Sequence, residues 1–172
     1  MFIGSICLFQ NKLMGKVVDI GQIPALIKQL KDRGQKIVLV GGCFDILHSA
    51  HIEFLKKAKA QGDILIVLLE SDERIRKLKG KNRPINNQKD RALILSNLPF
   101  VSFVLNLENV QSDRDYEILV KLVKPDIIAI TSGSPIYEWE KMYSKETGSK
   151  IVEVMDRKKD YSTTNIAQKI KL

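Results

Sequence analysis

Short apolar runs of strand length recur along this 172-residue chain, and a helical stretch separates each run from the next. The run at 64–69 is apolar on both faces, as strands of a parallel sheet are, because helices cover both sides of such a sheet. Strands that alternate with helices of this length are joined by right-handed crossovers. The pattern therefore predicts an α/β fold built on a doubly wound, five-stranded parallel sheet of the Rossmann-like kind. The five expected strands are 36–41, 64–69, 101–107, 127–130 and 150–155.

Helix boundaries are marked by capping residues and glycines. Asn86 or Asn87 and Ser112 are candidate N-caps, because their side chains can accept a hydrogen bond from a free backbone N–H. Gly34, Gly62 and Gly148 stand where helices are expected to stop. The expected helices are 22–33, 49–61, 72–77, from 86 or 87 to about 98, from 112 to a point before Pro125, 137–147 and 163–171.

The two histidines of the chain lie three residues apart, directly after the first expected strand and a pair of glycines. Glycines let the backbone come close to a ligand, and the N–H groups at a helix start attract anions. His48 and His51 are about one helical turn apart, so both rings can face the same ligand. A zinc site would need further ligands, and Cys7 is far away in the sequence. The segment 41–51 therefore indicates a phosphate-binding corner and a nucleotide site.

Residues 42–51, Gly-Cys-Phe-Asp-Ile-Leu-His-Ser-Ala-His, resemble the G-x-F-D-x-x-H-x-G-H motif of the HIGH-type nucleotidyltransferases. Ala50 stands where that superfamily has glycine. The resemblance implies the nucleotidyltransferase version of the Rossmann-like fold. It also implies catalytic roles for His48 and His51. The nucleotide-binding residues it implies are Gly42, Cys43, Phe44 and Asp45.

A basic stretch after the second expected strand extends this resemblance. Residues 76–86 are similar to the Arg-x-x-Lys-Gly-x-x-Arg-Pro-Ile-Asn stretch of the heptose-1-phosphate adenylyltransferases, and Asp-Arg-Ala follows at 90–92. Lys79 matches the lysine that contacts phosphates and is the third expected catalytic residue. Arg83 and Arg91 are further candidate binding residues, and packing or ion pairing is the alternative for both.

The C-terminal stretch 157–164 resembles the second motif of the family, an arginine followed by Ser-Thr-Thr at a helix start. Hydroxyls and free N–H groups in a first helical turn can receive a triphosphate. Arg157, Ser162, Thr163 and Thr164 are therefore expected to bind the nucleotide. Ser162 can also be a plain helix cap, and Thr163 is a better candidate for a ligand contact than Thr164.

One segment departs from the heptose enzymes. After Pro125 and Asp126 they have a strand that leads to Lys-Gly-Gly-Asp-Tyr, whereas this chain reads Ile-Thr-Ser-Gly-Ser-Pro at 130–135. In relatives this segment helps to form the nucleotide and acceptor pocket. The resemblance therefore defines the reaction class better than the acceptor.

The implied reaction is transfer of AMP from ATP to a phosphorylated acceptor, such as heptose 1-phosphate, with release of pyrophosphate. Mg²⁺ is the implied cofactor, held mainly by the phosphates. Asp45 is the nearest carboxylate that matches the family, and it either contacts the metal or orients the loop. The alternatives are cytidylyl transfer from CTP to glycerol 3-phosphate, adenylyl transfer to FMN, and a nucleotide-binding regulator that has lost turnover.

Composition limits the remaining possibilities. The net charge of +8 suits anionic ligands, but aromatic residues make up only 6% of the chain, which disfavours an RNA-binding module. Two cysteines build no disulfide framework, and no apolar run is long enough for a membrane span, so a cytoplasmic protein is expected. The expected organisation is one domain at 14–172 after an extension at 1–13. Whether the chain forms a homo-oligomer is left open.

Overall fold

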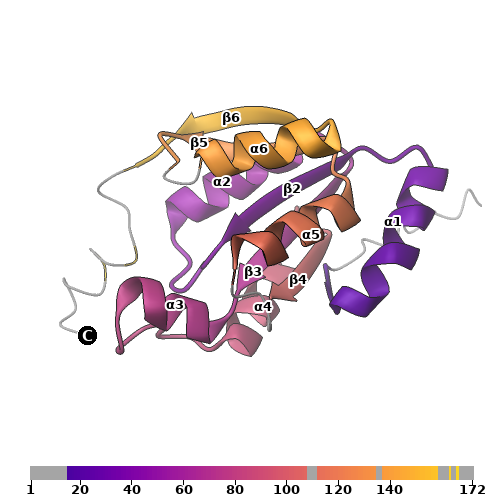
Figure 1. Cartoon of the computed structure of the whole chain (residues 1–172). Coiled ribbons are helices and arrows are strands. Elements are labelled where there is room, and N and C mark those ends of the chain that lie inside the picture. Colours follow the sequence, from indigo (N-terminus) through magenta and orange to yellow (C-terminus); the bar gives the residue numbers. More distant parts are fainter. Residues whose placement is uncertain (1–14, 108–111, 135–136, 159–162, 164–165, 167–172) are drawn as a thin grey trace, which may run out of the picture.

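The computed structural model describes residues 15–107, 112–134, 137–158, 163 and 166. Within these ranges the chain alternates between strands and helices (Figure 1). The strands are β1 (Lys16–Val18), β2 (Ile37–Gly42), β3 (Ile64–Glu70), β4 (Phe103–Leu107), β5 (Ile127–Ser132) and β6 (Lys150–Asp156). The helices are the 3₁₀ turn η1 (Ile20–Gln22), α1 (Ile23–Asp32), α2 (Ser49–Lys59), α3 (Asp72–Lys79), α4 (Gln88–Ser96), α5 (Asp113–Val123) and α6 (Tyr137–Thr147).

The strands of the described ranges form one sheet in the order β1-β4-β3-β2-β5-β6, and every pair is parallel. The prediction of a parallel sheet is confirmed, but the number of strands was wrong: there are six, not five. The additional strand is β1, which pairs at the sheet edge with Lys16 opposite Phe103. It has only three residues, and a run of that length shows no periodicity that the sequence could reveal.

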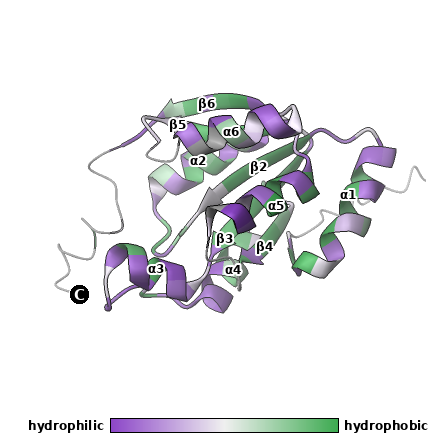
Figure 2. Ribbon diagram, viewed as in Figure 1, coloured by the Kyte–Doolittle hydropathy of each residue, from purple (hydrophilic) through white to green (hydrophobic). Residues whose placement is uncertain are grey.

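Helices cover both faces of this sheet because side chains alternate along each strand. Ile37 and Leu39 of β2 face α1, α5 and α6, whereas Val38 and Val40 face α2 and α4. In Figure 1 α5 and α6 lie in front of the sheet and α2 lies behind it. Figure 2 shows strands coloured almost wholly as hydrophobic and helices with mixed colouring, as expected for a sheet buried between two helical layers.

Most predicted helix boundaries agree with the structure. Asn87 is the N-cap of α4 and accepts a hydrogen bond from the Asp90 N–H, and Ser112 caps α5 in the same way. The helix predicted at 72–77 extends to Lys79, so this lysine ends a helix instead of beginning a loop. Strand β4 begins at Phe103, two residues later than predicted. Of the helix predicted at 163–171, Thr163 and Ile166 are helical, and the other residues lie outside the described ranges.

The strand order creates a switch point between β2 and β5. These neighbours pair through Val38 opposite Ile127, but the chain leaves β2 toward β3 on one side and leaves β5 toward β6 on the other. In open parallel sheets of this kind, ligands bind beyond the carboxyl ends of the strands at such a point. A ligand site is therefore expected at the ends of β2 and β5, at Gly42 and Ser132.

Candidate active site

A cavity of about 920 Å³ opens at the carboxyl ends of β2 and β5. Most residues that the sequence motifs singled out lie on its wall. These are Gly42, Cys43, Phe44, His48, His51, Lys79, Arg157 and Thr163. The fold thus brings together three motifs, the first and last of which are more than 100 residues apart in the sequence, and places them where the switch point predicts a ligand.

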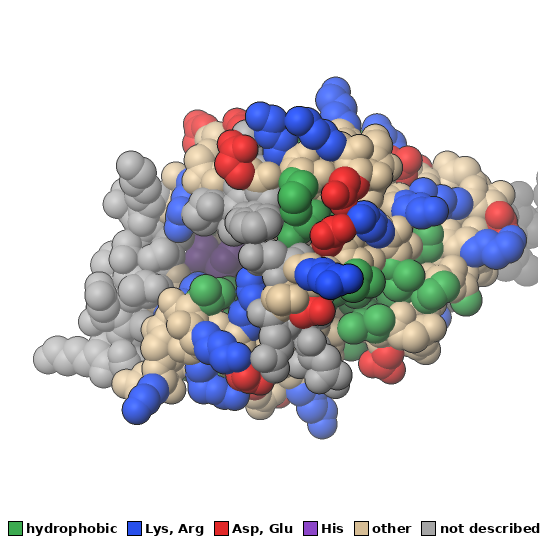
Figure 3. Space-filling view, in the orientation of Figure 1, with side chains coloured by type: hydrophobic (Ala, Val, Ile, Leu, Met, Phe, Trp, Pro, Cys, Tyr) green, Lys and Arg blue, Asp and Glu red, His purple; other side chains and the backbone are tan. Residues whose placement is uncertain are grey.

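The two histidines form the centre of this wall. His48 is the N-cap of α2 in an extended conformation, and its side chain makes no capping hydrogen bond. The rings of His48 and His51 stack with their centroids 3.7 Å apart and their planes at 21°. Figure 3 shows the histidine side chains, in purple, on the face of the molecule drawn there, with basic side chains close by. Both imidazoles and the first turn of α2 therefore line one cavity, so they can contact the same ligand.

Burial keeps these histidines uncharged. It lowers the pKa of His51 to about 4, with smaller contributions from the nearby charges of His48 and Lys79. Burial also lowers the pKa of His48. Nδ1 of each ring is inaccessible to solvent and has no hydrogen-bond partner among the described residues. At neutral pH the pair can therefore donate N–H hydrogen bonds to an anion without carrying charge itself.

The Phe44 ring packs against the histidine pair. It lies 5.2 Å from the His51 ring, centroid to centroid. The Phe44 backbone has a φ of +44°, which is rare for a bulky residue and typical of functional turns. A Cβ added at Gly42 would lie 2.8 Å from Cε2 of the Phe44 ring. The glycine of the motif is therefore required by close approach of this ring.

Asp45 supports the site from beneath instead of lining it. Its carboxylate is buried, with Oδ2 2.6 Å from Nε of Arg83 and Oδ1 accepting the N–H groups of Ile85 and Asn86. The side chain of Asn86 in turn donates to the Asp45 carbonyl. Of the two roles considered for Asp45, this geometry supports loop orientation. Arg83 is likewise an ion-pairing residue and does not line the cavity.

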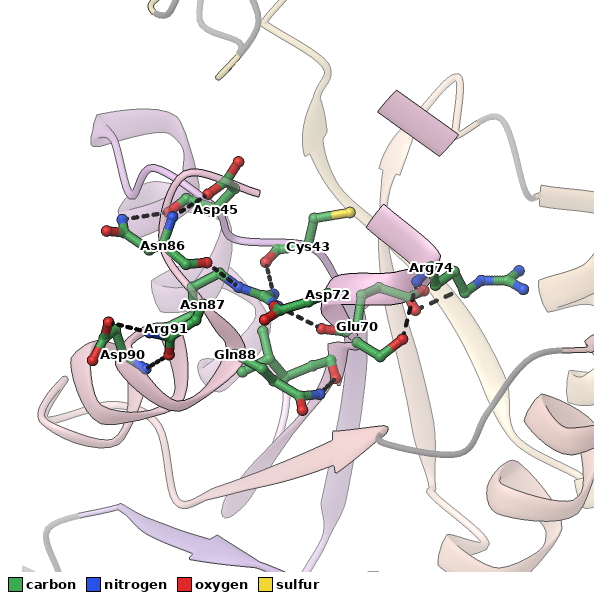
Figure 4. A network of polar contacts seen from close by, with 12 residues as sticks. Cys43, Asp45, Glu70, Asp72, Arg74, Asn86, Asn87, Gln88, Asp90 and Arg91 are labelled. Atoms are coloured by element: carbon green, nitrogen blue, oxygen red, sulfur yellow. Dashed lines mark hydrogen bonds and ion pairs between the residues drawn. The ribbon is translucent and has the colours of Figure 1, made fainter. Parts of the chain in front are cut away.

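Arg91 connects three loops behind the cavity. It is 1% exposed, and its guanidinium donates to the carbonyl oxygens of Asn86, Cys43 and Glu70 and to the Asp72 carboxylate. Figure 4 shows this network, with the Cys43 carbonyl directed at Arg91 and the thiol directed elsewhere. The alternative reading of Arg91 as a packing and ion-pairing residue is therefore the one that the structure supports. Burial raises the pKa of the Cys43 thiol.

The other motif residues flank the histidines. Lys79 at the end of α3 and Arg157 just after β6 are exposed and line the cavity, so they can reach an anion there. Thr163 is buried, and its hydroxyl lies 3.5 Å from the Ile46 carbonyl that it donates to. Ser162 and Thr164 lie outside the described residues.

Other wall residues lie outside the three motifs, and sequence reasoning missed Tyr116 among them. Tyr116 of α5 lines one end of the cavity, near Leu68 of β3. The segment 131–134 and residues 155–158 line the other end, where Ser132 donates to the Asp156 carboxylate at 2.6 Å. The resemblance had already connected the segment 130–135 and Arg157 with the pocket. For Met155, Asp156 and Lys158 the only signal was their place at a strand end, because the carboxyl ends of parallel strands meet at one edge. Tyr116 gave no signal, since it lies inside a helix.

The described residues offer no ready-made metal site. They contain no group of three or more His, Cys, Asp or Glu side chains placed to hold an ion. Both Asp45 oxygens are already engaged, as described above. The residues present therefore fit Mg²⁺ only as an ion carried by the phosphates of a ligand, a mode that is common for this cation. In the same ranges no helix is both long and apolar enough to cross a membrane.

Comparisons with known proteins agree with this geometry. Residues 39–169 match the model of the cytidylyltransferase-like family. The bifunctional protein HldE of Wolinella succinogenes is 38% identical over 161 residues, which is 94% of this chain and 32% of that protein. HldE of Sulfurimonas denitrificans is 42% identical over 152 residues, which is 87% of this chain and 30% of that protein. The chain thus spans about a third of the length of the curated relatives it matches.

Two solved structures share the fold. The lipopolysaccharide core biosynthesis protein from Thermoplasma volcanium is 30% identical with a TM-score of 0.59, over 75% of this chain and all of that one. Pantoate-beta-alanine ligase from Francisella tularensis, solved with beta-gamma ATP and beta-alanine, has a TM-score of 0.63 over 91% of this chain and 77% of that one. Its sequence identity is 19%, so this second likeness concerns the fold alone.

Proposed function

Since this chain belongs to the cytidylyltransferase-like family, we propose that it is a nucleotidyltransferase that moves AMP from ATP to the phosphate of a sugar phosphate. Heptose 1-phosphate is the proposed acceptor. The observation that carries the proposal is the pair of stacked, neutral histidines at the start of α2, on the wall of a cavity large enough for two ligands. The similarity to the HldE proteins over 94% and 87% of this chain supports the same reaction class.

In the proposed reaction, an oxygen of the acceptor phosphate attacks the α-phosphorus of ATP in line with the leaving group. The bond between that phosphorus and the α,β-bridging oxygen breaks, and pyrophosphate leaves with the electron pair of this bond. A diphosphate linkage between the nucleoside and the sugar remains. No protein nucleophile takes part, so catalysis consists of positioning and of stabilising the negative charge that develops.

The residues that line the cavity have separate roles in this reaction. His48 and His51 donate N–H hydrogen bonds to the α-phosphate and the bridging oxygen. Lys79 approaches the acceptor or transferring phosphate from the end of α3. Thr163, with Ser162 and Thr164 as sequence expects, holds the β- and γ-phosphates at a helix start. The phosphates of the triphosphate would hold Mg²⁺, which would neutralise part of their charge.

This assignment places the two substrates at opposite ends of the cavity. The nucleotide occupies the end formed by 131–134, Arg157 and Thr163, and the acceptor occupies the end formed by Leu68, Lys79 and Tyr116. The two substrates meet at the histidines between them. Gly42 and Cys43 provide the backbone surface over which the phosphates lie, because β2 ends there.

One observation favours a second candidate, which is the same chemistry with another nucleotide or another phosphorylated acceptor. Residues 131–134, Thr-Ser-Gly-Ser, line the cavity where the heptose enzymes have Lys-Gly-Gly-Asp-Tyr. Hydroxyl groups in place of a lysine remove a cation from this wall. Transfer of CMP to glycerol 3-phosphate and of AMP to FMN are therefore the alternatives to test.

A pyrophosphate-release screen tests the proposal directly. ATP and CTP, each with Mg²⁺, are combined with heptose 1-phosphate, glycerol 3-phosphate and FMN. Pyrophosphate release with ATP and heptose 1-phosphate, reduced about 10²- to 10³-fold in His51→Ala, is the expected result. Release only with CTP would overturn the adenylyl assignment. Binding of nucleotides with no release for any acceptor would favour a regulator that has lost turnover.

A further inference from the structure

Tyr116 is an aromatic side chain on the cavity wall, at the end proposed above for the acceptor. It comes from the first half of α5 and is half-buried on the wall near Leu68 and Val120. Phe44 also lines the cavity, but its ring packs against His51 and belongs to the catalytic corner. The wall between Lys79 and α5 therefore presents an aromatic ring on an otherwise apolar surface.

This ring is fixed by a polar cluster outside the cavity wall. The Tyr116 hydroxyl donates a hydrogen bond to Oε1 of Glu70, the last residue of β3. The Arg74 guanidinium of α3 lies over the Tyr116 ring, 5.2 Å from its centroid. Arg74 Nε is also 3.6 Å from Oε2 of Glu70, and the two side chains are only 23% and 13% exposed. Three elements, β3, α3 and α5, thus hold one ring in one orientation.

A ring held in this way is suited to recognition. A side chain that is already ordered loses little conformational entropy when a ligand packs against it. The face of an aromatic ring is apolar and electron-rich, so it binds flat groups that offer C–H bonds. A pyranose ring has such a face, whereas glycerol phosphate has only a short flexible chain. Binding sites of this kind combine apolar walls with a few polar groups that fix orientation.

The position of Lys79 indicates where the acceptor phosphate would lie relative to the Tyr116 ring. Lys79 ends the same helix that carries Arg74, and both Lys79 and Tyr116 line the cavity. If the acceptor phosphate lies between Lys79 and the histidines, the rest of the acceptor extends along Leu68 and Tyr116. The sugar ring of a sugar phosphate would then meet the aromatic face.

We propose that Tyr116 is a specificity-determining residue for the acceptor and packs against the C–H face of the ring of a sugar phosphate. Glu70 and Arg74 are positioning residues that hold the Tyr116 ring in place. This inference rests on the proposed function, because it assigns the acceptor to the α5 end of the cavity. It also gives a physical reason why the acceptor is cyclic, and the histidine motif alone gives no such reason.

The test compares a cyclic probe with an open-chain probe. Heptose 1-phosphate and glycerol 3-phosphate are titrated calorimetrically into the full chain, without ATP, for wild type, Tyr116→Leu and Tyr116→Phe. Tyr116→Leu should raise the dissociation constant for heptose 1-phosphate about tenfold, the scale of one well-packed aromatic contact. The constants for glycerol 3-phosphate and for ATP should change less than about twofold. Ile118→Ala, at an exposed position of the same helix, is the matched control.

Two further variants separate recognition from a structural role. Tyr116→Phe keeps the ring and loses the hydroxyl, so it should retain most of the preference for the cyclic probe. Glu70→Gln keeps an acceptor for the Tyr116 hydroxyl and should behave like Tyr116→Phe. Equal losses for heptose 1-phosphate, glycerol 3-phosphate and ATP in Tyr116→Leu would mean that Tyr116 only maintains the fold, and this would overturn the proposal. An unchanged ratio of the dissociation constants for heptose 1-phosphate and glycerol 3-phosphate would overturn it as well.

Turnover distinguishes this inference from the proposed function. If wild type releases pyrophosphate but Tyr116→Leu leaves the cyclic preference intact, the function stands and the role of Tyr116 is wrong. If no acceptor supports release but the cyclic preference depends on Tyr116, the recognition stands and the proposed reaction is wrong. If wild type binds neither phosphorylated probe, the role of Tyr116 is overturned.

Discussion

Replacing Asp45 with alanine should lower the free energy of unfolding by about 3–5 kcal/mol, the usual result when one partner of a buried ion pair is removed. Asp45 Oδ2 lies 2.6 Å from Arg83 Nε, and the side chains of Arg83 and Asp45 are 8% and 0% exposed. Oδ1 also accepts the N–H groups of Ile85 at 2.8 Å and Asn86 at 3.0 Å. The alanine variant leaves the Arg83 cation and both N–H groups buried without their partner.

Asp45→Asn is the matched control. Asparagine keeps the shape and one oxygen that can accept the two backbone N–H groups, but it loses the charge and turns an NH2 donor toward Arg83 in place of an acceptor oxygen. Its cost should be roughly half that of alanine, since the Arg83 cation remains unpaired. The double variant Asp45→Asn with Arg83→Met should regain much of this loss, because no buried charge is left. Urea denaturation followed by circular dichroism measures all four proteins.

The same variants distinguish the two roles considered for Asp45. A residue that only orients the loop leaves the Mg²⁺ concentration for half-maximal pyrophosphate release unchanged in Asp45→Asn. The structural reasoning is refuted if Asp45→Ala costs less than about 1 kcal/mol, the range of an exposed pair. A tenfold shift in the Mg²⁺ requirement with little loss of stability would instead identify Asp45 as a metal ligand.

Four other outcomes follow from the cavity wall. His51→Ala should reduce kcat by about 10²- to 10³-fold in steady-state assays while the melting temperature stays nearly unchanged, because one preorganised donor is lost. Since burial and the charge of His48 lower the pKa of His51 to about 4, the unfolded chain binds more protons between pH 6.5 and 4. Thermal unfolding of wild type should therefore show stability that is present above pH 6.5 and decreases toward pH 4, and His51→Ala should show a smaller decrease. Gly42→Ala should cost about 1–3 kcal/mol in denaturant titrations, because the new methyl group would displace Phe44. Thr163→Val should weaken calorimetric binding of ATP more than of AMP, and an unchanged ratio would leave Thr163 with a packing role only.

The sheet was accessible from the sequence because its central strands are long apolar runs. The run at 64–69 corresponds to β3, Ile64–Glu70, with interior residues that are fully buried. β1 was not accessible, since only Val18 of its three residues is buried and the strand depends on pairing with β4. Length therefore separates the strands that a pattern can reveal from the one that tertiary pairing creates.

Charge was the least informative signal along the sequence. Arg91 lies in a helix, and arginine is a residue that is mostly exposed, yet this one is 1% exposed. It is buried because four acceptors from three connections of the chain converge on its guanidinium. No local pattern contains that convergence. The histidines were different, because the glycines and helix start that position them lie in the same short segment.

The supporting interactions are distributed unevenly around the cavity. The buried pairs of Asp45 with Arg83, of Arg91 with its four acceptors and of Glu70 with Tyr116 all involve β3, α3, α4 or the loops between them. These elements form the proposed acceptor end and carry Lys79. Buried paired polar groups favour one arrangement of the backbone, because breaking a pair leaves a charge unpaired. A rigid acceptor end explains how a lysine at the end of a helix can be held near two histidines that belong to another element. It also makes the acceptor end, more than the segment 131–134, the place where a change of substrate would require several substitutions at once.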